Sequence, residues 1–425
     1  MRAQRKEGLA SRGSLPRKAP RRSSNEGGGS LRKARKVTSR RARFSPPGAA
    51  TLAVHAGELR PAVAGAIAMP LWSSATYELG AAQRYDDIRY VRLNNTPNQE
   101  AVAAKLAALE GCEAALVLPS GTAAVSFALA ALLRPGDHLL VQRGVYGGTR
   151  KVLEHLRATM GIEASYVEGE RPETWAAALR PQTRAFYVAS LTNPWLEIAD
   201  HAAVVDFARR RALVSIVDNT MASPINFQPR LLGFDYVLHS ASKYLNGHSD
   251  VVAGVIASSR EAIERLRVFV NRAGVCLDPH ACHLLQRGLK TLPLRMEAHN
   301  RSAAQLAARL ERHPALRRLR YPGLASHPQA ARAAALFRGF GGVLTFRLRS
   351  EAAAKAFVGR LRWAREAPGF GGAETLVCRP ATSSHAGLSA SLRRALEVGG
   401  EVVRLAVGLE SSEDLIDDVL SALEA

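Results

Sequence analysis

Short apolar runs alternate with amphipathic stretches through the middle of this chain. The runs are rich in Val, Leu, Ile and Ala, which is typical of strands buried on both faces of a sheet. They predict strands over Ala114–Leu118, His138–Gln142, Ala164–Val167, Arg184–Ala189, Val214–Asp218, Tyr236–His239 and Val251–Ala257. Helical spacing of apolar positions lies between them, as in Thr122–Leu133, Gly148–Met160 and Ala202–Arg211. The alternation predicts a mostly parallel sheet covered by helices, with ligand-binding groups at the ends of its strands.

The pattern changes after Pro279. A long helical pattern runs from there towards Arg312 with a break at Leu292-Pro293, and the chain restarts after Pro322-Gly323. The later pattern predicts in order a strand, a helix, a strand and a final helix, over Gly341–Leu348, Glu351–Leu361, Val403–Val407 and Glu413–Leu423. We therefore expect an α/β fold with a large domain over residues 111–312 and a smaller α+β domain over residues 313–425.

The positive charge of the chain is concentrated at its N-terminal end. Residues 1–48 hold 15 Lys and Arg against 2 Asp and Glu, so this basic tail carries +13 of the total formal charge of +21. The tail is poor in large apolar residues, cannot bury enough surface to offset the entropy cost of ordering, and is expected to be disordered. Three interpretations stay open: weak, non-specific binding to nucleic acid or another anionic surface, a transit-like segment, and an extension without function that starts at an upstream codon.

The rest of the composition indicates a soluble protein. With 425 residues and 47% hydrophobic composition, the chain is long enough for one large and one smaller core. No segment approaches the run of about 18 apolar residues that a membrane span needs. A metal site at His280 and His283 is not expected, because neighbouring residues at a helix start point apart. The four cysteines form no C-x-x-C pair and are expected to be buried thiols in a reducing compartment; they are Cys112, Cys276, Cys282 and Cys378.

The most informative polar residues follow two of the predicted strands. One strand ends in Asp218, and the next leads into Ser240, Ser242 and Lys243. A strand-end carboxylate suits a cationic ring nitrogen, and an amine flanked by hydroxyls suits an aldehyde carbon near a phosphate. The two together are what a pyridoxal phosphate enzyme needs, since one group keeps the pyridine protonated and the other bonds covalently to the cofactor. Taken alone, Lys243 would more simply be a surface lysine in a polar loop.

Several further motifs occur in order along the chain. They are Tyr90-Val91-Arg92, Leu109-Glu110-Gly111, Ser120-Gly121-Thr122-Ala123-Ala124, Tyr146-Gly147-Gly148-Thr149, Asp218-Asn219-Thr220 and Val403-Arg404-Leu405-Ala406-Val407-Gly408-Leu409-Glu410. With the Lys243 segment, they make the chain resemble the trans-sulfuration family from about Thr51 to the C-terminus. This family of cysteine and methionine metabolism includes cystathionine γ-synthase, the cystathionine lyases, methionine γ-lyase and the O-acylhomoserine sulfhydrylases. The resemblance implies a transferase-like fold of fold-type I and pyridoxal 5'-phosphate as cofactor.

The start of the helix after the first predicted strand is the expected phosphate site. Glycine allows a close approach there, and the amides and dipole of a helix start favour an anion. By the resemblance, the amides of Gly121 and Thr122 hold the phosphate, and the hydroxyls of Ser240 and Ser242 assist. From the residues alone, an ordinary helix N-cap at Ser120 is the favoured interpretation.

The resemblance also implies an assembly. By it, Tyr90 and Arg92 reach across a dimer interface to the neighbouring subunit's phosphate, where an arginine is suited to bidentate contact. Residues 49–110 then form an N-terminal arm with dimer contacts, and the protein is a homotetramer built as a dimer of dimers. The residues alone show only an exposed aromatic and an exposed cation. The next segment, Asn94–Asn98, departs from the commoner N-P-T pattern, so its substrate contacts stay open.

Three more side chains are expected around the cofactor and substrate. Tyr146 is expected to stack on the cofactor ring, with a half-buried core tyrosine as the alternative. Asn193 matches the family position that hydrogen-bonds the phenolic oxygen of the ring or the substrate carboxylate. Arg404 follows two valines in an apolar strand, where an unpaired guanidinium is costly and an anionic partner is expected. The family uses this arginine to bind the substrate α-carboxylate, and Arg379 is a weaker second candidate.

These residues imply a reaction. Lys243, buried and so easily deprotonated, removes the substrate α-proton, while Asp218 and Tyr146 complete the catalytic set. A thiol or an acyloxy group then leaves from Cβ or Cγ. The predicted function is a cytoplasmic carbon–sulfur lyase that cleaves cystathionine or a related sulfur amino acid by β- or γ-elimination.

Two alternatives stay open. One is γ-replacement on an acylhomoserine, and the other, from a different class, is a nucleic-acid-binding protein that acts through the basic tail. Where relatives often carry a glutamate and a serine, this chain has Pro368 and Gly369, and Glu366 lies two residues away. The sequence therefore does not choose the sulfur amino acid.

Overall fold

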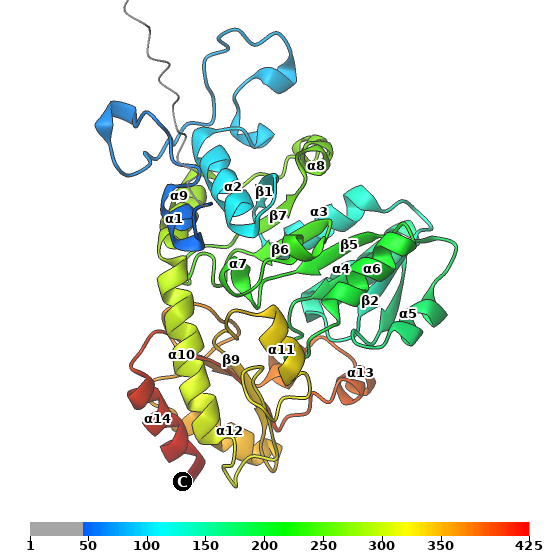
Figure 1. The fold of residues 1–425 in the computed structure, drawn as a ribbon, viewed down its shortest axis with the longest axis vertical. Coiled ribbons are helices and arrows are strands. Elements are labelled where there is room, and N and C mark those ends of the chain that lie inside the picture. The colour runs from blue at the N-terminus through cyan, green and yellow to red at the C-terminus, as the bar shows by residue number, and fades with distance from the viewer. Residues whose placement is uncertain (1–45, 425) are drawn as a thin grey trace, which may run out of the picture. The chain divides into compact units, whose positions relative to one another are not determined.

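The larger sheet of this protein has seven strands in the order β1-β7-β6-β5-β4-β2-β3 (Figure 1). The computed structural model describes residues 46–424, and from Pro47 on the chain forms one compact unit that contains this sheet. Neighbours from β6 to β3 pair in parallel, whereas β7 is antiparallel to β1 and to β6. The mostly parallel sheet is thus confirmed. The strands are β1 Ala114–Leu118, β2 His138–Gln142, β3 Glu163–Val167, β4 Thr183–Ala189, β5 Val214–Asp218, β6 Tyr236–Ser240 and β7 Gly254–Ser258.

One predicted strand starts later than expected. Residues 251–253 lie outside β7, although Val251–Ala257 was predicted as a strand. The backbone of Ala253 instead bonds to the loop beyond the end of β6: Ala241 N donates to Ala253 O at 2.8 Å, and Ala253 N donates to Ser242 Oγ at 3.0 Å. The apolar run therefore supports the Lys243 segment before it enters the sheet.

Helices cover both faces of the larger sheet. Successive residues of one strand enter different cores: Ile216 packs with α3, α4 and α8, and Val217 packs with α2, α6 and α9. The helices are α1 Ala49–His55, α2 Pro97–Glu110, α3 Gly121–Leu132, α4 Gly147–Met160, α5 Pro172–Ala178, α6 His201–Arg210, α7 Ser223–Asn226, α8 Arg260–Arg272, α9 Pro279–Lys290, α10 Leu292–Leu310, α11 Ala330–Leu336, α12 Glu351–Arg360, α13 Ala390–Ala395 and α14 Ser412–Glu424.

Helix α8 was not predicted from the sequence. Its buried stripe of Ala262, Ile263, Leu266 and Val270 has helical spacing, and Ser259 caps its start by accepting a hydrogen bond from Ala262 N. Both signals were present in the sequence. The predicted break near Leu292-Pro293 is real, since α9 ends at Lys290 and α10 begins at Leu292.

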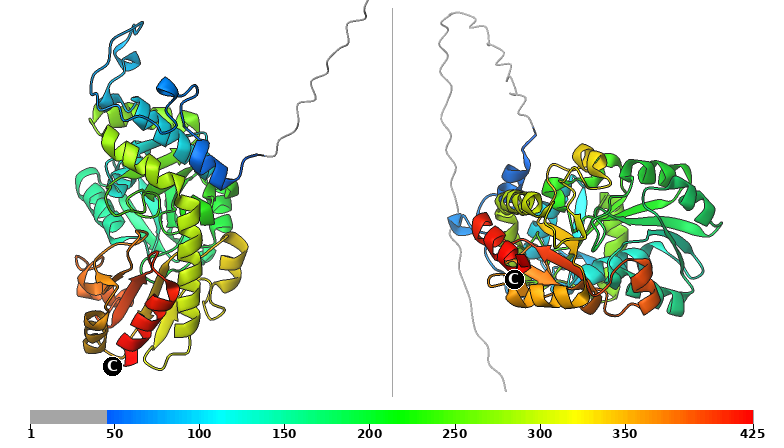
Figure 2. Two further views of the ribbon diagram at one scale, coloured as in Figure 1. Left: turned by 90° about the vertical axis from the view of Figure 1, so that its left-hand side faces the viewer. Right: turned by 90° about the horizontal axis from the view of Figure 1, so that it is seen from below.

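A second sheet of five strands follows, in the order β10-β11-β12-β9-β8. Helix α10 links it to the larger sheet, because the first half of α10 packs in a core of the larger sheet and the second half packs in the core of the second. Figure 2 shows α14 alongside α10. The boundary at residues 312/313 stays a prediction. The strands are β8 Arg318–Arg320, β9 Val343–Arg347, β10 Arg365–Glu366, β11 Leu376–Cys378 and β12 Val402–Ala406.

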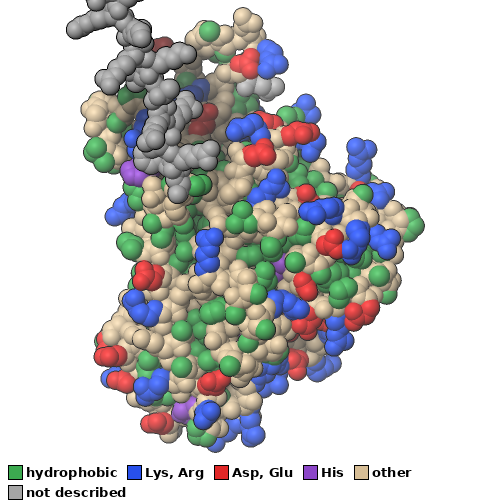
Figure 3. All heavy atoms as spheres, in the orientation of Figure 1, with side chains coloured by type: hydrophobic (Ala, Val, Ile, Leu, Met, Phe, Trp, Pro, Cys, Tyr) green, Lys and Arg blue, Asp and Glu red, His purple; other side chains and the backbone are tan. Residues whose placement is uncertain are grey.

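Lys and Arg side chains are mixed with Asp and Glu side chains over the face drawn in Figure 3. Among residues 46–424, every helix is too short or too polar to span a lipid bilayer. The prediction that all four cysteines are buried is wrong for Cys112 and Cys276, which are half-buried, and right for Cys282 and Cys378. The predictions for the basic tail fall outside the described residues, apart from its last few positions.

Candidate active site at the ends of β5 and β6

The ends of β5 and β6 bring the predicted acid and the predicted lysine to the same edge of the sheet. The two strands pair in parallel, with Asp218 opposite Leu238. Ser240 ends β6, and Lys243 lies in the turn that follows, where its amide donates to Ser240 O at 3.3 Å. Carboxyl ends of adjacent parallel strands form ligand sites because their loops leave the sheet on the same side.

The surroundings of the Lys243 amine favour its neutral form over the charged one. Burial, and then the positive charge of Arg404, lowers the pKa of Lys243 below its ordinary value. Both cations lie near one aromatic ring: Lys243 Nζ is 5.5 Å and Arg404 Cζ is 5.8 Å from the centroid of Phe370. Gly369 completes this wall, since a Cβ on it would lie 3.9 Å from Lys243 Nζ.

Arg404 is the most deeply buried cation of the site. It lies on β12 with 3% of its surface exposed, donates from Nη1 to Asn193 Oδ1 at 3.3 Å, and donates from Nη2 to Gly369 O at 2.9 Å. Both partners are neutral, and its Nε has no hydrogen-bond partner among the described residues. A buried guanidinium with a free N–H and no carboxylate partner suits an anionic ligand.

Two neighbours of Arg404 refine this picture. Burial, and then the charge of Arg404, lowers the pKa of the buried His385 to about 4, so this imidazole is neutral at pH 7 and does not compete for an anion. Sequence reasoning missed His385. Arg379 donates to Glu351 Oε1 at 3.2 Å, so a carboxylate already engages this second candidate.

The carboxylate of Asp218 is held in one orientation. Its Oδ1 accepts from Thr220 N at 3.0 Å and from Thr220 Oγ1 at 2.5 Å, and Tyr187 Oη lies 3.4 Å from Oδ2. Burial, and then the charge of Asp218, raises the pKa of Tyr187 well above its ordinary value, so Tyr187 remains a hydrogen-bond donor. Tyr187 comes from β4 and was not predicted, because nothing in the sequence brings it next to Asp218.

The start of α3 lies directly against the end of β6. Ser120 caps the helix by accepting a hydrogen bond from Ala123 N at 3.0 Å, and the first amides of the helix, those of Gly121 and Thr122, have no acceptor within it. A Cβ on Gly121 would lie 2.6 Å from Ser240 Cβ. Glycine is thus required for the helix start and Ser240 to approach each other, and the unpaired amides suit a phosphate.

The two predicted serines differ in their surroundings. Ser242 Oγ donates to Ala253 O at 3.3 Å and accepts from Ala253 N, so its hydroxyl is engaged by the backbone. Ser240 adjoins the helix start, and its own amide donates to Thr220 Oγ1 at 2.8 Å. Of the two hydroxyls, that of Ser240 is the better placed for an anion at α3.

Tyr146 lies just before α4 and is 48% exposed in the single chain, so its ring is not part of the core. Its ring lies against Gly148, where a Cβ would be 2.3 Å from Cε1 of the tyrosine. An exposed ring backed by glycine is a suitable flat surface for an aromatic ligand.

Tyr90 and Arg92 are engaged elsewhere in the chain. Arg92 Nη1 donates to Asn271 O at 3.1 Å, Nη2 donates to the Tyr85 hydroxyl, and the guanidinium lies 5.3 Å from the centroid of the Tyr90 ring. Within residues 46–424 these contacts place both residues beside α8 rather than beside Lys243. A single chain therefore does not bring them to the Lys243 site.

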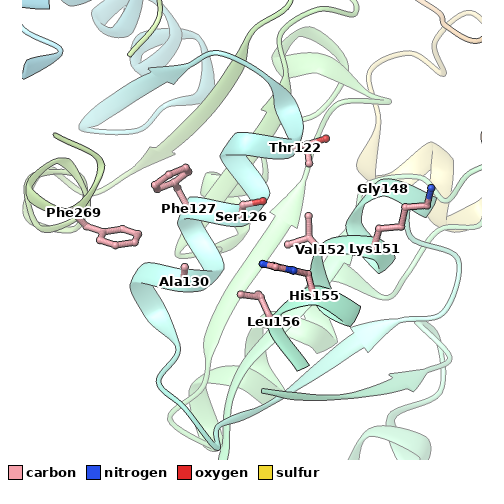
Figure 4. Close-up of a pocket in the computed structure, with 10 residues that line it drawn as sticks. All are labelled: Thr122, Ser126, Phe127, Ala130, Gly148, Lys151, Val152, His155, Leu156 and Phe269. Carbon is pink, nitrogen blue, oxygen red and sulfur yellow. The ribbon is translucent and has the colours of Figure 1, made fainter. Parts of the chain in front are cut away.

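A cavity of about 490 Å³ opens between α3, α4 and α8 (Figure 4). Thr122 and Gly148, from the two helix starts, lie on its lining, and Phe127 and Phe269 make much of its wall apolar. No set of three His, Cys, Asp or Glu side chains in the described part of the chain is arranged to hold a metal ion.

The comparisons with known proteins agree with this geometry. The family model described as Cys/Met metabolism PLP-dependent enzyme matches residues 50–424. Cystathionine gamma-lyase of Bacillus subtilis (strain 168) is 39% identical over 375 residues, which cover 88% of this chain and 98% of that protein. Cystathionine gamma-synthase of Mycobacterium tuberculosis (strain ATCC 25618 / H37Rv) is 38% identical, with coverage of 88% and 97%. The crystal structure of cystathionine gamma-lyase from Lactobacillus plantarum superimposes with a TM-score of 0.85 at 35% identity, and the match covers 89% of this chain and 99% of that one.

Proposed function

This chain belongs to the Cys/Met metabolism PLP-dependent enzyme family, and we propose that within it the protein cleaves cystathionine or a related sulfur amino acid by β- or γ-elimination. It is a pyridoxal phosphate enzyme and a carbon–sulfur lyase of trans-sulfuration. The observation that carries the proposal is the placement of Lys243 and Arg404. Near the ring of Phe370 lie an amine of lowered pKa, which would bond to the cofactor, and a guanidinium without an anionic partner among residues 46–424, which would bind the substrate carboxylate.

The residues present fit the cofactor. The free amides of Gly121 and Thr122 and the hydroxyl of Ser240 would hold its phosphate, and the exposed ring of Tyr146 would stack on its pyridine. Asp218 would face the ring nitrogen, and Lys243 would bond to the cofactor covalently through its amine. Ser242 would contribute mainly by supporting this segment through Ala253.

The chain's own groups then account for the remaining steps. When bound, the cofactor withdraws electrons from the substrate α-carbon. Arg404, with Asn193 beside it, binds the α-carboxylate and orients the α-hydrogen. Lys243 Nζ, released when the substrate amino group takes its place on the cofactor, would then accept the α-proton, and its lowered pKa favours the neutral amine that this requires. Asp218, oriented by Thr220 and Tyr187, would present its carboxylate to the ring nitrogen.

A second candidate is γ-replacement on an acylhomoserine. The similarity to a cystathionine gamma-synthase at 38% identity favours it. Gly369 also favours it, because this residue has no side chain and so leaves room beside Lys243. Position 368 is a proline, so it offers no carboxylate to the substrate of either candidate. Glu366 lies exposed on β10. The two candidates differ in whether a thiol leaves or enters.

The proposal includes a homotetramer in the cytoplasm, built as a dimer of dimers. The position of Arg92 beside α8, away from its own Lys243, supports sites shared between subunits. The open apolar cavity beside Thr122 and Gly148 supports the same idea, since a neighbouring arm would cover it.

Product analysis tests the function. The purified protein is incubated with cystathionine, with methionine, and with an acylhomoserine plus a thiol. We expect a thiol and a 2-oxo acid from cystathionine. A thioether product from the acylhomoserine mixture, with no release of thiol from cystathionine, would replace the lyase by the second candidate.

A further inference from the structure

A buried carboxylate joins the two strand ends that carry the cofactor groups. Glu110, the last residue of α2, is 1% exposed. Its Oε1 accepts a hydrogen bond from Asn219 Nδ2 at 2.9 Å and from His239 Nε2 at 2.5 Å. Asn219 follows Asp218 at the end of β5, and His239 precedes Ser240 at the end of β6. One oxygen thus contacts both strands, each one residue from a cofactor group.

This buried carboxylate is not expected to stabilise the fold by itself. A negative charge at the C-terminus of a helix is opposed by the helix dipole, and burial removes its hydration. Among the described residues, Glu110 Oε2, His239 Nδ1 and Asn219 Oδ1 are all buried without a hydrogen-bond partner. Apolar residues of similar volume often serve stability as well as or better than such a buried set.

The carboxylate instead completes a hydrogen-bond network that links the ends of β5 and β6. On the side of the site, Thr220 Oγ1 donates to Asp218 and accepts from Ser240 N. Behind them, Asn219 N donates to Leu238 O at 2.8 Å, and Glu110 holds the side chains of Asn219 and His239. Among residues 46–424, Glu110 is the one group that hydrogen-bonds to both of these side chains, so its loss would leave them without a common partner.

We propose that Glu110 is a positioning residue that sets the spacing between Asp218 and the Ser240–Lys243 segment. It acts through Asn219 and His239 and does not touch the cofactor or the substrate. The inference rests on the proposed function, because the spacing matters only if Asp218 and Lys243 serve the same cofactor.

The test measures the affinity of the cofactor-free protein for pyridoxal phosphate, by absorbance titration, in Glu110→Ala and Glu110→Gln. A matched control is His138→Ala at the opposite ends of the strands, where a buried histidine bonds Thr183 Oγ1 at 2.8 Å and Ser165 Oγ at 2.9 Å. Glu110→Ala and His138→Ala each remove two buried hydrogen bonds. A thermal melt of each cofactor-free variant gives the loss of stability.

Glu110→Ala should weaken cofactor binding at least about tenfold, and Glu110→Gln, which keeps one acceptor oxygen, about threefold. His138→Ala should bind within about twofold of the wild type although it melts earlier. Amide hydrogen exchange should rise in peptides covering residues 218–220 and 239–243 of the Glu110 variants and not in residues 138–142. If Glu110→Ala does not fold, Glu110→Gln carries the comparison.

Cofactor affinity within about twofold of the wild type in every Glu110 variant that folds overturns the inference. An equal loss in His138→Ala also overturns it, since the effect would then be general. Failure of the proposed function looks different: the wild-type protein itself would form no borohydride-reducible adduct at Lys243, or would form it and release no thiol from cystathionine. If the wild-type protein forms the adduct and the Glu110 variants bind the cofactor as tightly as the wild type, only this inference is contradicted.

Discussion

At the scale of single residues, the site brings together two basic side chains that have no carboxylate partner among residues 46–424. Lys243 and Arg404 lie near the same ring, and the charge of Arg404 acts on the lysine pKa. Like charges raise each other's cost of burial, so the free site favours an anion and an amine that is easily neutral. This is the electrostatic requirement of an enzyme that handles α-amino acids.

Lys243→Ala should abolish turnover, because the covalent link to the cofactor and the base for the α-proton are lost together. A loss of about a thousandfold or more is expected for a group with both roles. The rate of thiol release from the best substrate measures it, with cofactor content determined in parallel. A variant that keeps more than about a hundredth of the wild-type rate would contradict the assignment.

Arg404→Gln should move the pH dependence of cofactor attachment upward. The charge of Arg404 is the second cause, after burial, of the lowered Lys243 pKa. Its removal raises that pKa towards the ordinary value, so the neutral amine appears only at higher pH. The pH at which cofactor-free protein forms half of its borohydride-reducible adduct measures the shift.

The matched control for this titration is Arg379→Gln. Arg379 pairs with Glu351, and its charge does not contribute to the lowered pKa of Lys243. We expect the control to keep the wild-type midpoint. Equal midpoints in both variants and the wild type would show that Arg404 does not act on Lys243.

At the scale of elements, the site depends on how closely the start of α3 approaches the end of β6. The chain meets this need with glycine: a Cβ on Gly121 would lie 2.6 Å from Ser240, and one on Gly254 of β7 would lie 2.0 Å from Ser120 O. The start of α3 thus meets β6 and β7, which lie far from it in the sequence, without side chains between them. The amides of α3 and the Ser240 hydroxyl face one site for this reason.

Gly121→Ala should lower both stability and cofactor affinity. The added methyl group forces α3 away from Ser240, and overpacking of this kind costs about 1–3 kcal/mol. Thermal unfolding and absorbance titration of the cofactor measure the two effects. Gly359→Ala is the control, because a Cβ on this glycine of α12 meets nothing within 4 Å. It should be stabilising by about 0.4–1 kcal/mol, and wild-type cofactor affinity in Gly121→Ala would show that the approach of α3 does not matter.

At the scale of the whole molecule, the basic tail is expected to be separate from catalysis. Deletion of residues 1–48 should leave activity and cofactor content nearly unchanged, because the segment has no apolar stripe with which to join a core. It should remove most salt-sensitive binding to DNA or heparin, since the tail carries +13 of the formal charge. Activity and heparin-column elution test this, and loss of activity on truncation would make the tail part of the assembly.

A mixing experiment tests the shared site. Arg92→Ala and Lys243→Ala subunits should each be inactive, and a hybrid dimer regains one site with both native residues while its other site carries both defects. Activity should return on mixing, up to about half of wild type per hybrid dimer. Proven exchange of subunits without recovery of activity would mean that Arg92 acts within its own chain or not at all.

The sequence by itself determined the elements and the chemistry carried on them. Buried strands such as β1, β2 and β5 were predicted to the residue, because a continuous apolar run between polar turns has few other solutions. Asp218 and Lys243 were found because Asp218 ends such a run and Lys243 lies in the turn just after another. The order of motifs then indicated the family and its cofactor before any contact was known.

Only the tertiary structure decided which distant residues meet. Tyr187 reaches Asp218 from the neighbouring strand, and Gly121 makes room for Ser240. Glu110 ties Asn219 to His239 although more than a hundred residues separate it from either. Such contacts depend on strand order, register and the exact seating of a helix, which local periodicity does not encode. The sequence therefore determined which groups are available, and packing determined which of them act together.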